Sequence, residues 1–121
     1  MTTVLVVDDE EPIREFLIDV LHSEGYRVLA ASDGKQALAL ALREQPVLVL
    51  ADVMMPVMTG TELCRCLKRE HADLAVRVVL MSAALSALTD DTEADAFLPK
   101  PFDLDHLLAL IAEYAGPPRG G

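Results

Sequence analysis

The chain has 121 residues, enough for one domain with a substantial hydrophobic core that needs neither disulfides nor a structural metal. Its 20 acidic and 10 basic residues give a formal net charge of −10 at pH 7, which opposes direct binding to nucleic acid or to an anionic membrane surface. The N-terminus has no signal-like segment, and the longest apolar stretch, residues 47–58, is interrupted by Asp52 and Pro56. We therefore expect a cytoplasmic protein with no membrane partner.

Five apolar runs, each short enough for a β-strand, alternate with segments of helical periodicity. The first helical segment has Pro12 in its first turn and ends at Gly25. The second is rich in Ala and Leu and ends before Pro46, and the third follows a loop over residues 56–60. We expect Asp103 to cap the last helix. The expected strands are residues 4–7, 27–31, 47–52, 76–82 and 96–98.

The central runs are almost uniformly aliphatic, which is typical of parallel strands buried on both faces. Alternating strands and helices, joined by right-handed crossovers, predict an α/β fold with a doubly wound five-stranded parallel sheet and three layers, α/β/α. We expect one domain over residues 1–115. Residues 116–121, GPPRGG, can continue neither a helix nor a strand, so we expect a flexible C-terminal tail or linker stub.

Polar residues stand where four of these runs end. Asp8 and Asp9 close the first run, Asp52 closes the third, Ser82 closes the fourth and Lys100 follows the fifth. The carboxyl ends of the strands in an open parallel sheet share one crevice, so we expect these side chains to lie close together. The pattern predicts one functional site at this edge of the sheet.

Three neighbouring carboxylates repel one another unless a cation or raised pKa values relieve them. Mg²⁺ takes oxygen ligands and commonly joins a few carboxylates to phosphate oxygens, so it is the expected cofactor. With the metal bound, an Asp52 oxygen is placed to attack a phosphoryl group in line. The Lys100 ammonium would offset the charge of the phosphoryl oxygens, and Ser82 would donate a hydrogen bond to one of them.

Four motifs, VDDE, DVMMPVMTG, LMS and FLPKPF, follow one another along the chain. Together they resemble the motifs of CheY-like response-regulator receiver domains of two-component signalling, and the resemblance covers Thr3 to about Tyr114. It implies the flavodoxin-like strand order 2-1-3-4-5. It also implies two kinds of partner: a sensor histidine kinase or phosphotransfer protein as phosphodonor, and a downstream effector protein.

The resemblance implies a role for each residue of the site. Asp52 is the phosphoacceptor, and Asp9 and Asp52 bind Mg²⁺ directly together with the backbone carbonyl of Met54. Asp8 acts mainly through a water. The chain would then catalyse only its own phosphorylation and slow dephosphorylation, so we regard it as a signalling domain and not as an enzyme.

The same resemblance implies a switch near the last two strands. Lys100 and Ser82 contact the phosphoryl group, and the peptide bond between Lys100 and Pro101 is cis. Phosphorylation draws the Ser82 hydroxyl inward and lets Phe97 occupy the space behind it. The surface near these strands changes as a result, which is a two-state switch biased by local charge.

The segment between Ser82 and Lys100 is about one helical turn shorter than is usual in the family. We expect its helix to be short, irregular or absent and residues 83–95 to be mobile. The shortening motivates an alternative function, a phosphorylation-independent interaction module of the same fold. A phosphohydrolase with an Asp nucleophile is disfavoured, because the first acidic motif is not of the D-x-D type and no substrate cap is present.

Overall fold

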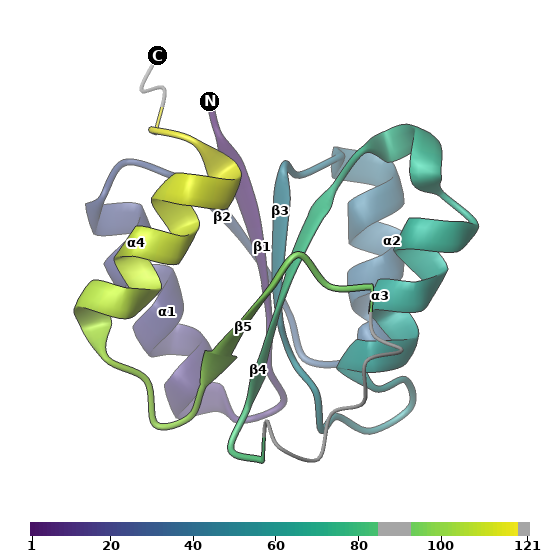
Figure 1. Cartoon of the computed structure of the whole chain (residues 1–121), viewed down its shortest axis with the longest axis horizontal. Helices are drawn as coiled ribbons and strands as arrows, with labels where there is room; N and C mark the ends of the chain where they lie inside the picture. The colour runs from purple at the N-terminus through teal and green to yellow at the C-terminus, as the bar shows by residue number, and fades with distance from the viewer. Residues whose placement is uncertain (85–92, 119–121) are drawn as a thin grey trace.

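The computed structural model describes residues 1–84 and 93–118, which form one sheet covered by helices on both faces (Figure 1). The strands are β1 Thr3–Val7, β2 Arg27–Ala31, β3 Leu48–Asp52, β4 Arg77–Ser82 and β5 Ala96–Pro99. The helices are α1 Glu11–Ser23, α2 Gly34–Glu44, α3 Gly60–Arg69 and α4 Leu104–Ala115, with a 3-10 turn at Ala72–Leu74.

The five strands are parallel and lie in the order β2-β1-β3-β4-β5. This order confirms the predicted doubly wound sheet. Sequence neighbours β1 and β2 pair on one side of β1, and β3 pairs on the other side, so the winding direction reverses between β1 and β3. Val7 is in register with Ala51, and the residues that follow them, Asp8 and Asp52, therefore lie side by side at the carboxyl ends of β1 and β3.

Two hydrophobic layers hold the sheet between its helices. One layer lies under α1 and α4 and the other under α2 and α3. Every residue of β1 and β3 is buried, which explains why these two runs are aliphatic without alternation. Two fully buried leucines of α1, Leu17 and Leu21, lie one turn apart and face the first layer, as their helical spacing predicts.

Local capping explains where the helices begin. The Asp33 side chain accepts from the Gln36 N–H at the start of α2, and Thr59 and Glu62 form a capping box at the start of α3. The Asp103 side chain accepts from the Asp105 N–H, which confirms the predicted cap of α4.

The chain that follows α4 folds back against the start of the sheet. The Tyr26 hydroxyl donates to the Gly116 carbonyl at 2.8 Å, and the Thr2 hydroxyl donates to the Pro117 carbonyl at 3.1 Å. Residues 119–121 lie outside the described residues, as does most of the segment expected to be mobile, residues 85–92. None of the described helices is long and apolar enough to cross a membrane.

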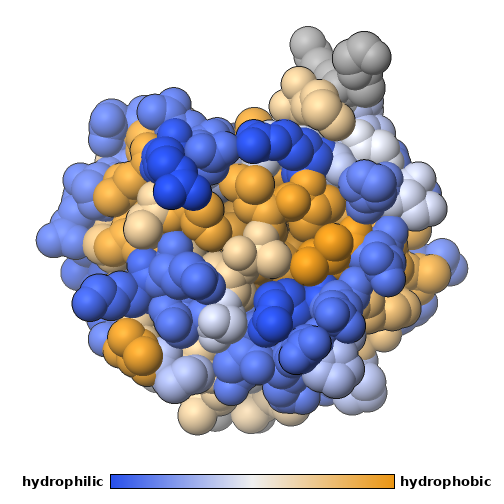
Figure 2. Space-filling model, turned by 180° about the vertical axis from the view of Figure 1, so that it is seen from behind, coloured by the Kyte–Doolittle hydropathy of each residue, from blue (hydrophilic) through white to orange (hydrophobic). Residues whose placement is uncertain are grey.

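The β2 edge of the sheet is open to solvent, because β2 pairs only with β1. Val28 and Leu29 are half-buried and Ala30 is exposed. Seen from behind, the molecule has a band of apolar residues across its middle, bordered by hydrophilic ones (Figure 2).

Candidate functional site

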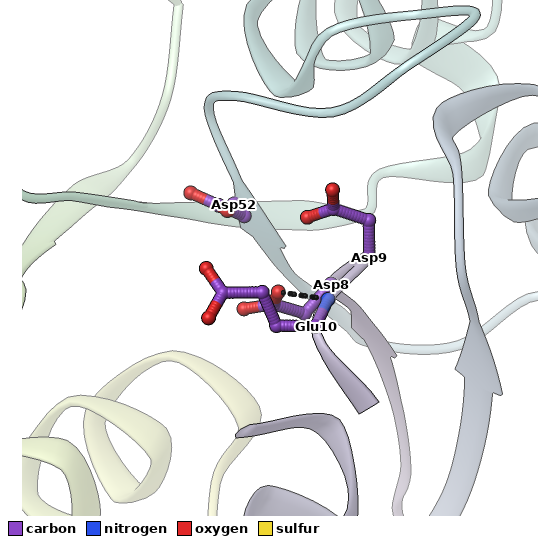
Figure 3. A group of neighbouring side chains, drawn as sticks. All are labelled: Asp8, Asp9, Glu10 and Asp52. Atoms are coloured by element: carbon purple, nitrogen blue, oxygen red, sulfur yellow. Dashed lines mark hydrogen bonds between the residues drawn. The ribbon is translucent and has the colours of Figure 1, made fainter. Parts of the chain in front are cut away.

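Four carboxylates gather at the carboxyl ends of β1 and β3. Asp8 follows β1 directly, Asp9 and Glu10 lead into α1, and Asp52 is the last residue of β3. One oxygen from each of the four lies within 4.8 Å of the others (Figure 3). The predicted cluster of Asp8, Asp9 and Asp52 is therefore present, and it contains a fourth acid, Glu10.

Asp8 is fully buried and has both carboxylate oxygens engaged. Its Oδ1 accepts from the Glu10 N–H at 2.9 Å, and its Oδ2 accepts from Lys100 Nζ at 2.9 Å. Its backbone is held as well, since its N–H donates to the Ala31 carbonyl and its carbonyl accepts from Arg14 Nη1 at 2.8 Å. Asp8 is thus an internal anchor of the cluster.

Lys100 joins the two strands' carboxylates. Its Nζ lies 2.9 Å from Asp8 Oδ2 and 3.3 Å from Asp52 Oδ2, and its side chain is only 13% exposed. Burial alone would lower the pKa of Lys100, but the Asp8 and Asp52 carboxylates together outweigh it and hold that pKa above its ordinary value. Lys100 is therefore a fixed positive charge at the site. The peptide bond to Pro101 is cis, as expected.

Asp52 is buried at the floor of the cluster. Burial raises the pKa of its carboxyl above the ordinary value, and the charge of Asp8 raises it further. Lys100 and the Met54 N–H oppose this shift without cancelling it. The negative charge of Asp52 is thus incompletely compensated by the protein, which is the electrostatic condition that a bound cation would relieve.

The other predicted residues surround this centre. Ser82 ends β4, is buried, and accepts at Oγ from the Ala84 N–H at 3.0 Å. Its carbonyl accepts from the Lys100 N–H at 2.9 Å, which ties the ends of β4 and β5 together. Phe97 is half-buried on β5 and packs against the layer under α2 and α3. Met54 is 73% exposed, two residues after Asp52.

The loop after Asp52 is a tight turn held close to the strand. The Met58 N–H donates to the Pro56 carbonyl at 2.7 Å across Val57, whose φ is 71°. At Gly60 an added Cβ would lie 2.2 Å from the Asp52 carbonyl oxygen, so only glycine permits this approach. The end of the loop is thereby held against the end of β3.

Sequence reasoning missed Glu10 as a member of the cluster. The signal was the unbroken acidic run of residues 8–11, in which only the first two residues were assigned a role. The acidic sequence does not predict where the Glu10 side chain points, because Glu10 lies at the transition from the end of a strand to a helix.

A cavity of about 440 Å³ opens beside Lys100. Its wall is mainly apolar and comes from the start of α1 and from the ends of β4 and β5. The lining residues are Ile13, Ala83, Lys100, Pro101 and Phe102. The charged centre therefore has apolar surface next to it.

Residues 4–112 match the family model of the response regulator receiver domain. The chain belongs to this family. Response regulator MprA of Mycolicibacterium vanbaalenii is 43% identical over 110 residues, which are 89% of this receiver domain and 48% of that protein. The receiver domain thus spans about half the length of the curated relatives it matches. Response regulators act in two-component signalling, so this is a signalling domain.

Solved structures agree with this assignment. Chemotaxis response regulator CheY4 of Vibrio cholerae has a TM-score of 0.85 and 30% identity, over 94% of the receiver domain and 98% of that chain. Response regulator TrrA of Thermotoga maritima, solved in complex with Mg²⁺-BeF, has a TM-score of 0.85 and 31% identity, over 94% and 99% of the two chains. The predicted CheY-like fold is confirmed.

Proposed function

We propose that this receiver domain works in the cytoplasm as a phosphoacceptor switch, taking a phosphoryl group onto Asp52 from a sensor histidine kinase or a phosphotransfer protein. The observation that carries the proposal is the position of Lys100 Nζ, 2.9 Å from Asp8 and 3.3 Å from Asp52 within a cluster of four carboxylates. A fixed ammonium beside a buried aspartate is the arrangement that stabilises charge on a transferring phosphoryl group.

The oxygen ligands of the cluster fit a hard divalent cation, and Mg²⁺ is the proposed one. Asp9 and Asp52 would hold it directly together with the Met54 backbone carbonyl. When bound, Mg²⁺ neutralises charge on the phosphoryl oxygens and on the carboxylates around them. The Mg²⁺-BeF complex of TrrA supports this assignment by similarity.

In the transfer step, an Asp52 carboxylate oxygen forms a bond to phosphorus while the bond from phosphorus to the donor histidine nitrogen breaks. The electron pair of that bond stays on the imidazole, and Asp52 becomes an acyl phosphate. Lys100 stays protonated throughout, since its carboxylate neighbours hold its pKa high, and it offsets the charge of the equatorial oxygens. The Ser82 hydroxyl donates to one of these oxygens.

The output of the switch is proposed to be a protein surface read by a downstream effector protein. Ser82 Oγ accepts from the Ala84 N–H, so turning the hydroxyl toward a phosphoryl group releases that contact. Phe97 then moves into the space behind Ser82. The net charge of −10 supports an effector that is not nucleic acid.

Intact mass spectrometry tests the proposal. The protein is incubated with Mg²⁺ and either acetyl phosphate or phosphoramidate, beside Asp52→Asn and, as a matched control, the exposed α1 variant Asp19→Asn. We expect one added phosphoryl group in the wild type and in the control, and none in Asp52→Asn or in EDTA. If the wild type binds Mg²⁺ and gains no phosphoryl group, the phosphorylation-independent interaction module becomes the better reading.

A further inference from the structure

We infer that Glu10 is the third carboxylate that helps to hold the divalent cation, and that Asp8 instead serves as the internal anchor of the site. This inference rests on the proposed cation site and names a residue to which neither the acidic motif nor the family likeness assigns a role. The basis of the inference is the difference between the hydrogen-bond partners of the Asp8 and Glu10 carboxylates.

Asp8 is poorly placed to bind a metal directly. It is fully buried, its Oδ2 accepts from Lys100 Nζ, and its Oδ1 accepts from the Glu10 N–H. A cation bound directly to Oδ2 would come close to the Lys100 ammonium and be repelled by it, and burial restricts access to both oxygens. We therefore infer that Asp8 reaches a cation at most through a water, which is also the role that the family resemblance implies.

Glu10 has the opposite character. It is exposed, and although it occupies the N-cap position of α1, its side chain makes no capping hydrogen bond. Its carboxylate extends instead toward the side of the cluster where Asp52 lies (Figure 3). A glutamate that stands at a helix start and does not cap the helix has its oxygens available for another partner.

Asp8 also explains why Glu10 points there. The hydrogen bond from the Glu10 N–H to Asp8 Oδ1 closes a local turn from the end of β1 into α1. This turn fixes the Glu10 backbone next to the cluster, and the Arg14 N–H donates to the Glu10 carbonyl at 3.0 Å on the helix side. The anchor therefore positions the third carboxylate.

Glu10 adds a negative charge close to the cation without being buried, so it costs little desolvation when the cation is absent. Mg²⁺ keeps several waters, and a long exposed carboxylate can accept hydrogen bonds from them. Loss of this charge should weaken cation binding by about three- to tenfold, the range that Coulomb attraction allows in water-screened surroundings.

The competing reading is that Glu10 only complements the dipole at the start of α1. Glu11 separates the two readings, because it is exposed and lies in the first turn of the same helix but does not belong to the four-carboxylate cluster. Glu10→Gln and Glu11→Gln each remove one negative charge from the chain, and both remove it near the N-terminus of α1. Only the first removes a carboxylate from the cluster.

The test is a calorimetric titration of the full chain with Mg²⁺, repeated with Mn²⁺ followed by electron paramagnetic resonance. We expect Glu10→Gln to raise the Kd about three- to tenfold and Glu11→Gln to change it less than twofold. Equal Kd values for the two variants would overturn the role of Glu10 while leaving the cation site intact. Failure of the wild type to bind either cation would overturn the proposed site itself.

Discussion

Replacing Lys100 by Met should destabilise the domain most strongly at neutral pH. The substitution keeps an unbranched apolar stem of similar length and removes the ammonium between Asp8 and Asp52. Two charge contacts of 2.9 and 3.3 Å are lost, each with a gross attraction of about 5 kcal/mol at an effective dielectric constant of about 20. Much of this attraction only offsets the free-energy cost of desolvating the buried lysine. We therefore expect a net loss of about 2–4 kcal/mol in the free energy of unfolding.

The sign of the pH dependence follows from Asp52. Burial already raises the pKa of Asp52 above its ordinary value of 3.8, and loss of the ammonium raises it further. The folded variant then binds this proton more tightly than the unfolded chain does, so stability is retained at low pH and falls as the pH rises through the raised pKa. The deficit against the wild type should be largest at pH 7 and shrink toward pH 4.

Urea unfolding followed by circular dichroism, at both pH values and without divalent cations, measures the deficit. Lys35→Met is the matched control, because Lys35 is exposed at the start of α2 and forms no ion pair with another described residue. A Lys100→Met variant within about 0.5 kcal/mol of this control at pH 7 would refute the reasoning, because loss of the ammonium leaves two buried carboxylates side by side without a compensating charge.

Three further substitutions have expected outcomes. Asp52→Asn should raise the melting temperature at pH 7 without Mg²⁺, because burial disfavours the charged carboxylate; a lower melting temperature contradicts this. Asp95→Asn should cost about 2 kcal/mol at pH 7, since Asp95 accepts from Lys68 Nζ and from the Val78 N–H. Its pKa is lowered overall, because these hydrogen bonds and nearby cations outweigh its burial, so the cost in urea titrations should vanish as the pH falls through that lowered value. Gly60→Ala should cost about 3 kcal/mol or more in the same assay and slow phosphorylation, because the added Cβ would clash with the Asp52 carbonyl oxygen. An unchanged stability would show that the loop can move away from β3 at little cost.

The positions of the strands along the chain were predictable from local patterns. Aliphatic runs bounded by turn residues identify buried parallel strands, and the observed bounds of β3 and β4 each begin one residue later than expected. The cap at Asp103 was predictable because a carboxylate before an apolar-periodic segment has one common use. Strand ends then indicated which polar residues share a crevice, since parallel strands place their carboxyl ends at one edge.

The different roles of the acidic residues within that crevice could not be predicted from local sequence patterns. Asp8 and Glu10 differ by two positions in one acidic run, yet one is fully buried with both oxygens engaged and the other is exposed. One of the two hydrogen bonds that engage Asp8 comes from Lys100, which is 92 residues away from Asp8 in the chain. No local pattern encodes such a contact.

The amino-acid sequence by itself determined the layered sheet and the edge at which the acidic residues, Ser82 and Lys100 gather, because hydrophobic periodicity and turn chemistry are local properties. Only the tertiary structure decided which carboxylates face inward as anchors and which remain open to a cation. That choice depends on the distances between side chains from β1, β3 and β5, which exist only once the strands have paired.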